Sequence, residues 1–209
     1  ESLYTIREIQ EANGVHACHR YIISNCRGAI DVARLYALCR FCGWNTQDFT
    51  LDIVPLFETI SDLRQSETSM HILYESSCYR EHLSQRSNRQ TVMLGFSDGT
   101  KDGGYLMANW AIYSAKESLT RISRQFDIEV CFFDGRGGPP ARGGGSTYKF
   151  YSSLGKNIEA NQIQLTVQGQ TISSYYGTEV GAIHNLRQLI AAGLENNLGE
   201  RPKKELSES

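Results

Sequence analysis

The chain has 209 residues, 40% of them hydrophobic, with a formal net charge of -2 at pH 7, which is typical of one globular domain or a large part of one. A slightly acidic chain attracts an extended phosphate backbone weakly, so no nucleic-acid partner is expected. No stretch approaches the ~20 uninterrupted apolar residues of a membrane span, and the start ESLYTIREIQ does not resemble a signal peptide, so we predict a soluble cytoplasmic protein without membrane contact.

Short apolar, β-branched or aromatic runs alternate with longer amphipathic stretches along the chain. The runs are predicted to be strands: RYIIS at 20–24, TLDIVPLF at 50–57, TVMLGF at 91–96, IEVCFF at 128–133 and IQLTV at 163–167. The other stretches repeat apolar residues every three or four positions and are predicted to be helices: 33–43, 60–83, 102–126, 146–155 and 180–198. The polar segment 199–209 is predicted to be a disordered tail or a truncated connection.

This alternation predicts a parallel sheet built from right-handed crossover units. An open doubly wound sheet and part of a (β/α)8 barrel both fit it. The polar residues that follow the runs, among them Asn25, Glu58 and Asp98, favour the barrel, because the carboxyl ends of barrel strands converge on one rim. We therefore predict that residues 1–198 form an α/β catalytic region with about five strand-helix units, part of a barrel with extra helices in a larger enzyme.

Two carboxylates follow successive predicted strands, Glu58 in VPLFETI and Asp98 in GFSDGTKDGG. Magnesium and manganese take oxygen ligands and commonly use one or two carboxylates, with water and substrate completing the shell. The pair therefore predicts a site for Mg2+ or Mn2+. The alternative is that both are helix N-terminal acids stabilised by the helix dipole.

The stretch FFDGRGGPPARGGG at 132–145 places Arg136 and Arg142 among glycines and prolines directly after an apolar run. Glycine lets a backbone approach a ligand closely, and arginine suits phosphates and carboxylates. The segment is predicted to clamp a small anion. An RGG-type nucleic-acid tail is the alternative, but such tails are usually repetitive, and this segment lies between a predicted strand and a predicted helix.

The six cysteines lie in helix-like or strand-like segments and not at the spacing of a disulfide framework, which favours reduced core thiols for most of them. Cys39 and Cys42 form a CxxC on a predicted helix without a second ligand pair for zinc.

Five ordered motifs resemble those of the phosphoenolpyruvate carboxylase family. They are YIIS, VPLFETISDL, VMLGFSDGTKDGG, FFDGRGGPPARGGG and QIQLTVQGQTI. The resemblance implies the middle of the family's C-terminal half, an elaborated (β/α)8 barrel, and a homotetramer for the full-length protein. It also implies a reaction in which phosphoenolpyruvate and bicarbonate give oxaloacetate and phosphate through carboxyphosphate and the pyruvate enolate, with Mg2+ or Mn2+.

The resemblance assigns roles to individual positions. Glu58 and Asp98 match the family's two metal ligands. Arg136 matches an arginine that contacts substrate phosphate or the enolate oxygen, and Arg142 matches one that helps to hold bicarbonate and carboxyphosphate. Lys101 matches the lysine of the aspartate motif and is expected near the site.

Departures from the family pattern qualify this assignment. Asp134 stands where the family commonly has histidine and is kept as a candidate catalytic residue, and Val167 and Gln170 replace two acids. A histidine and a further arginine of the family's site belong upstream of this segment, so the 209 residues alone are expected to be inactive. The alternatives are a non-catalytic anion-binding or interaction scaffold and a different phosphoenolpyruvate or pyruvate barrel enzyme.

Overall fold

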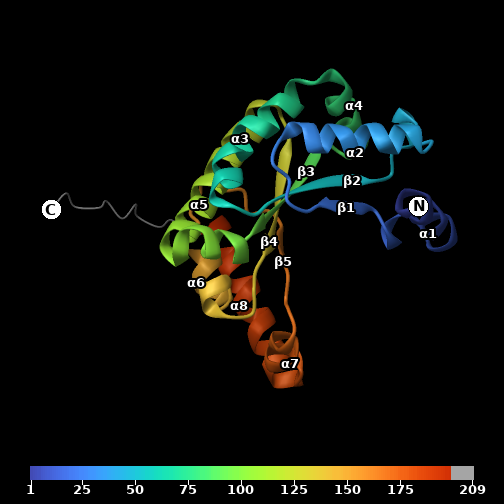
Figure 1. The fold of residues 1–209 in the computed structure, drawn as a ribbon. Coiled ribbons are helices and arrows are strands. Elements are labelled where there is room, and N and C mark those ends of the chain that lie inside the picture. Colours follow the sequence, from blue (N-terminus) through green and yellow to red (C-terminus); the bar gives the residue numbers. More distant parts are fainter. Residues whose placement is uncertain (199–209) are drawn as a thin grey trace.

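Figure 1 shows a computed structural model that describes residues 1–198. Five parallel strands form one sheet in chain order: β1 (Arg20–Ile23), β2 (Asp52–Phe57), β3 (Arg89–Gly95), β4 (Glu129–Gly135) and β5 (Ile163–Leu165). The helices are α1 (Ser2–Asn13), α2 (Ala29–Phe41), α3 (Ile60–Glu75), α4 (Ser77–Gln85), α5 (Ser97–Gln125), α6 (Thr147–Ser152), α7 (Gln170–Tyr176) and α8 (Glu179–Leu198). Short 3-10 turns lie at Val15–Ala17, Thr46–Asp48 and Pro140–Arg142.

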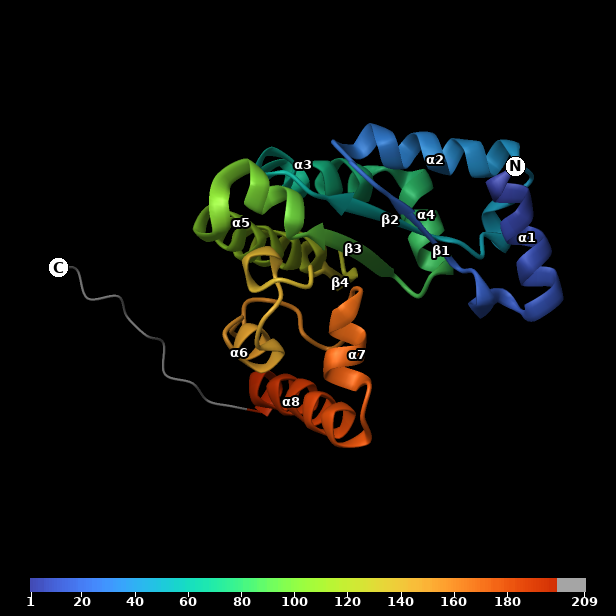
Figure 2. The ribbon, with the colours of Figure 1, turned by 60° about the horizontal axis from the view of Figure 1, so that its bottom comes forward.

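The order of the strands separates the two predicted architectures. A doubly wound sheet reverses its strand order and carries helices on both faces, whereas barrel strands follow one another around an arc with their helices outside. The order β1-β2-β3-β4-β5 contains no reversal, and α2, α3, α4 and α5 lie on one face of the sheet (Figure 2). The prediction of a partial barrel is therefore confirmed.

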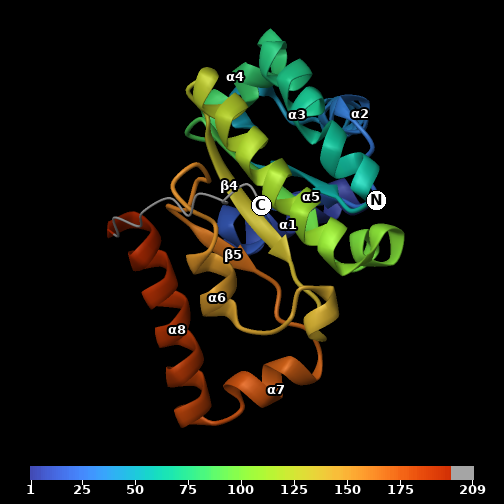
Figure 3. The same cartoon turned by 90° about the vertical axis from the view of Figure 1, so that its left-hand side faces the viewer.

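The C-terminal helices form a separate group beside the last two strands. Figure 3 shows α8 running alongside α6, with α7 near the start of α8. The hydroxyl of Tyr148 on α6 donates to Glu195 Oε2 on α8 at 2.6 Å, which ties these helices together.

The strand register decides which side chains face the helices. Phe57 pairs with Leu94, Leu94 with Asp134, and Asp134 with Leu165, and paired residues point to the same face of a sheet. Phe57 and Leu94 belong to the core under the helices, so Asp134 points to the helix side as well. By the same alternation, the next positions along the chain, Glu58 and Gly95, belong to the opposite face.

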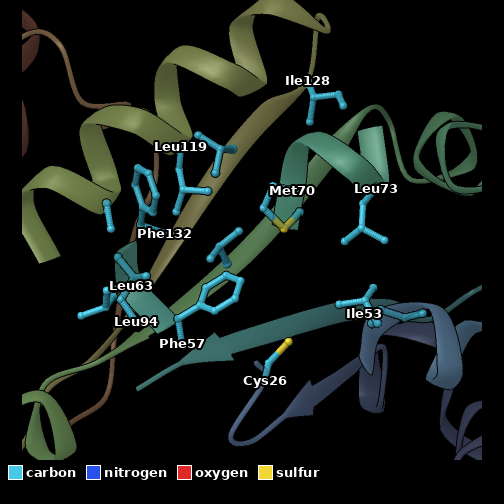
Figure 4. Close-up of a cluster of buried hydrophobic side chains, with 14 of the residues drawn as sticks. Cys26, Ile53, Phe57, Leu63, Met70, Leu73, Leu94, Leu119, Ile128 and Phe132 are labelled. Carbon is cyan, nitrogen blue, oxygen red and sulfur yellow. The ribbon is translucent and has the colours of Figure 1, made fainter. Parts of the chain in front are cut away.

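The core lies between this face and the helices. Figure 4 shows Phe57, Leu94 and Phe132 from the strands meeting Met70 from α3 and Leu119 from α5. All five side chains are at most 4% exposed. This burial fixes the strands whose ends carry the candidate site residues.

Several predicted boundaries were wrong. The helix predicted over 60–83 is two helices, because Ser76 adopts extended backbone (ψ 119) and its N–H bonds back to Leu73 O, which ends α3. Helix α5 begins at Ser97 and not at 102, with a break at Gly104 (φ 78). Helices α1 and α7 lie where no helix was predicted, and the predicted tail 199–209 lies outside the described residues.

All six cysteines are free thiols. Burial raises the pKa of Cys39 to about 12 and that of Cys26 to about 11, which makes both thiols poor nucleophiles and poor metal ligands. Within residues 1–198, no helix has both the length and the apolar character that a membrane crossing requires.

Candidate active site

The candidate residues lie at the carboxyl ends of neighbouring parallel strands. Asn25 follows β1, Glu58 follows β2, Asp98 lies in the first turn of α5 after β3, and Arg136 follows β4. Because the strands are parallel and adjacent, these positions share one edge of the sheet.

Glu58 is held by the loop that follows β1. The backbone N–H of Asn25 donates to Glu58 Oε2 at 2.8 Å, and Asn25 adopts a positive φ of 52, which asparagine tolerates. Capping of α3 falls to other residues, because Thr59 and Asp62 form a reciprocal capping box there. The Glu58 carboxylate is therefore not used as a helix cap, which weakens that alternative for this residue.

Glycines bring the Asp98 turn against Glu58. A Cβ at Gly95 would lie 3.1 Å from Glu58 Cγ, and a Cβ at Gly99 would lie 3.4 Å from the Glu58 carbonyl oxygen. Asp98 stands between these two glycines in sequence, so its turn lies beside Glu58. The Asp98 carboxylate is about half exposed and accepts from Lys101 Nζ at 2.6 Å.

Asp102 ties the same turn to α3. Its Oδ2 accepts from the backbone N–H of Ile60 at 3.1 Å, two residues after Glu58. Glu58 and Asp98 are thus carried on two segments joined by a direct hydrogen bond.

Arg136 is buried, and its guanidinium is turned toward its own loop. Nε donates to the carbonyl of Gly143, Nη2 donates to the carbonyl of Gly144 at 3.2 Å, and Nη1 donates to Thr147 Oγ1 at 3.4 Å. The guanidinium carbon also lies 4.9 Å from the centre of the Phe150 ring. Arg136 therefore shapes the loop after β4, and every one of these acceptors is a neutral oxygen.

Arg142 is exposed on the same loop. Its N–H donates to Pro139 O at 2.9 Å, and its carbonyl accepts from Gly137 N at 2.7 Å, so the loop folds back on itself. Among residues 1–198, the Arg142 side chain has no ion-pair partner. The two arginines of the predicted clamp thus differ: one is built into the loop, and the other points to solvent.

A small open pocket of about 20 Å3 lies between this loop and the segment after β5. Arg136 and the glycines of the loop border it on one side, and Thr166, Gln168 and Tyr176 border it on the other. Thr166 Oγ1 donates to the Arg136 carbonyl at 2.8 Å, which joins the two sides. A pocket of this volume holds about one water molecule, so an anion beside Arg136 would require the two sides to move apart.

Asp134 does not face this pocket. It is 1% exposed on the helix side of the sheet, its two oxygens each lie 2.8 Å from Lys116 Nζ on α5, and its Oδ2 also accepts from Tyr151 OH at 2.7 Å. Burial and the neighbouring Asp134 charge raise the pKa of Tyr151 well above its usual value, so Tyr151 stays a hydrogen-bond donor. The catalytic role suggested for Asp134 stays a prediction.

Sequence reasoning missed Lys116 and Tyr151. A signal for Lys116 exists in the helix pattern, because it lies four residues after Ile112 and three before Leu119, two residues of the buried stripe of α5. A lysine on such a stripe requires a buried partner.

The donor set fits the implied metal. Within residues 1–198 no group of three or more His, Cys, Asp or Glu side chains could hold a metal ion, but Mg2+ needs only one or two carboxylates. Glu58, which is partly buried, and Asp98, which is about half exposed, lie on adjacent turns at one edge of the sheet and meet that requirement.

Comparisons with known proteins place these features in context. A family model described as phosphoenolpyruvate carboxylase matches residues 1–208. Relatives named phosphoenolpyruvate carboxylase include one from Chromobacterium violaceum, 38% identical over 93% of this chain and 22% of the relative, and one from Nitrosomonas europaea, 39% identical over 93% and 21%. One from Corynebacterium diphtheriae is 43% identical over 71% of this chain and 16% of the relative. The chain thus spans about a fifth of the length of the first two.

Proposed function

Because the chain belongs to the phosphoenolpyruvate carboxylase family, we propose that the whole protein converts phosphoenolpyruvate and bicarbonate to oxaloacetate and inorganic phosphate. The observation that carries the proposal is the shared strand edge on which Glu58 and Asp98 lie next to the arginine loop. A cytoplasmic location and a homotetramer are part of the same proposal.

The reaction needs fixed positive charge at oxygen atoms. A bicarbonate oxygen attacks the phosphoryl group and the bond from phosphorus to the enol oxygen breaks, which gives carboxyphosphate and the pyruvate enolate. Carboxyphosphate then releases phosphate and CO2, and the enolate carbon bonds to that CO2. Both steps move negative charge among oxygens, which preorganised cations stabilise.

Different residues of this chain would supply the positive charge that the reaction needs. Glu58 and Asp98 would hold Mg2+ or Mn2+, which supplies Lewis-acid stabilisation of the developing negative charge. Arg136, fixed by the carbonyls of Gly143 and Gly144, offers a positioned charge at the pocket, and the exposed Arg142 is free to turn toward a second anion such as bicarbonate. Lys101, paired with Asp98, balances the charge of that carboxylate.

The test replaces the proposed metal ligands in the whole protein. Glu58→Ala and Asp98→Ala are each expected to lower metal-dependent oxaloacetate formation by at least about 100-fold. Glu67→Ala is the matched control, because Glu67 is a partly exposed acid on α3 whose ion-pair partner within residues 1–198 is Arg121. Full activity in either ligand variant would reject the proposed site.

A non-catalytic scaffold is the second candidate, favoured by Asp134 at a position where the family commonly has histidine. It predicts that the whole protein binds phosphoenolpyruvate with Mg2+ but forms no oxaloacetate. Calorimetric binding measured beside the activity assay separates these two outcomes.

A further inference from the structure

The ion pair of Lys116 and Asp134 lies directly behind the arginine loop, yet neither side chain borders the pocket. Both side chains are 1% exposed, and Lys116 Nζ lies 2.8 Å from each carboxylate oxygen. Burying a charge pair costs solvation energy that the attraction often does not recover, so such a pair needs a reason other than stability.

The aromatic rings around the pair connect it to Arg136. Lys116 Nζ lies 5.3 Å from the centre of the Phe150 ring and 5.7 Å from that of Tyr151. The Arg136 guanidinium carbon lies 4.9 Å and 5.9 Å from the same two ring centres. Two cations and one carboxylate therefore share a water-poor environment, in which their charges interact strongly.

Asp134 lies two residues before Arg136, and both contact Tyr151: its hydroxyl donates to Asp134 Oδ2 and its ring centre lies 5.9 Å from the Arg136 guanidinium carbon. Lys116 and the Tyr151 hydroxyl take up the carboxylate, and the recorded acceptors of Arg136 are neutral oxygens. We infer that Lys116 is a positioning residue that holds Asp134, so that the charge of Arg136 stays available to the phosphate or carboxylate group of a bound anion. This inference rests on the proposed function, which supplies that anion.

The net charge of the three groups predicts in which direction each substitution changes anion binding. Lys116, Asp134 and Arg136 together carry one positive charge. A neutral residue at 116 leaves a buried carboxylate beside Arg136 and cancels that charge. An amide at 134 leaves the net charge at least as positive as before, in either protonation state of Lys116. The two single changes break the same ion pair, but only the change at 116 lowers the net charge at the anion site.

The experiment compares Lys116→Met, Asp134→Asn and the double variant in the whole protein at pH 8. Both single variants are expected to lower Tm, since each leaves one buried charge unpaired. Only Lys116→Met is expected to raise the KM for phosphoenolpyruvate, by at least about tenfold. Asp134→Asn should not raise it, and the double variant should return the KM to within about threefold of the unaltered protein. Lys116→Gln, whose amide can still donate to Asp134, replaces Lys116→Met if the latter does not fold.

Leu119→Ala is the control for lost stability, because Leu119 is a core residue one turn from Lys116 on α5. It should lower Tm without changing the KM. Equal KM increases in both single variants, or increases that follow Tm in all variants, would show a purely structural role and overturn the inference.

A binding measurement that does not depend on turnover distinguishes failure of the proposed function from failure of the inference on Lys116. If the unaltered protein forms no oxaloacetate, the proposed function fails, and calorimetric binding of inorganic phosphate then tests Lys116. The same ranking of affinities is expected there. Absence of phosphate binding by the unaltered protein, or equal binding by the two single variants, would overturn the inference.

Discussion

The imidazole of His82 on α4 is buried among three aromatic rings, those of Tyr36, Phe49 and Tyr79. Burial lowers the pKa of His82 to about 4, and of the nearby charges Asp52 raises it while Arg86 lowers it. As the pH falls below 6.5, His82 is therefore protonated in the unfolded chain but stays neutral in the folded protein until about pH 4. The free energy of unfolding should fall over this window by about 3 kcal/mol from this residue.

Urea unfolding between pH 7 and pH 4 measures this effect. His82→Gln should flatten the dependence on pH, whatever it does to stability at pH 7. His71→Gln is the control, because the His71 side chain on α3 is 43% exposed and its replacement should change the pH dependence of the free energy of unfolding far less. If the free energy of unfolding changes equally with pH in all three proteins, His82 is not the source of the effect.

The loop between β4 and α6 depends on one glycine for its shape. Gly143 has φ +85, and a Cβ there would lie 2.5 Å from the ring of the buried Phe96. Its carbonyl is also an acceptor for Arg136. Gly143→Ala should therefore disturb both the packing of the loop on the β3 end and the position of the guanidinium.

Gly145 supplies a matched control on the same loop. It has φ +86, but a Cβ there would meet only Pro140 Cβ at an ordinary 3.8 Å. Both alanine variants carry the backbone cost of a positive φ, about 1 to 2 kcal/mol. Gly143→Ala should lose about 1 to 3 kcal/mol more from overpacking. If denaturant unfolding gives equal losses of unfolding free energy for the two variants, the contact with Phe96 does not restrict residue 143.

Periodicity identified the five strands and the long helices because burial on one face imposes it. It did not place the end of α3, since Ser76 interrupts an apolar pattern that continues into α4. Strand-end positions led to Glu58, Asp98 and Arg136, which the fold brings to one edge. The sequence did not predict that Arg136 would donate hydrogen bonds to its own loop, because these bonds depend on the backbone path of Gly143 and Gly144.

The whole sheet explains why Asp134 was difficult to interpret. In the linear sequence it precedes Arg136 and looks like a site residue. Strand alternation turns it to the helix side, in line with Leu94 and Leu165, where Lys116 and Tyr151 meet it. The register between strands that are far apart in sequence decides this, and no local pattern shows it.

Five strands in sequential order form an arc, and closing a barrel of this type takes eight. Within residues 1–198, β1 pairs only with β2, and β5 pairs only with β4. The rim described by these residues is therefore open on both sides of Glu58 and Arg136. A site for two anions and a metal needs groups from further strand ends to exclude water from the reactive enolate.

We therefore expect the 209 residues alone to form no oxaloacetate from phosphoenolpyruvate and bicarbonate with Mg2+, although we propose that Glu58 and Asp98 are required in the whole protein. A coupled assay of the isolated chain measures this, with the Glu58→Ala, Asp98→Ala double variant as the background. The isolated chain should still bind Mg2+ weakly through its two carboxylates, and the double variant should not. Turnover by the isolated chain above that background would contradict the expectation, because it would mean that the five strand ends already complete a working site.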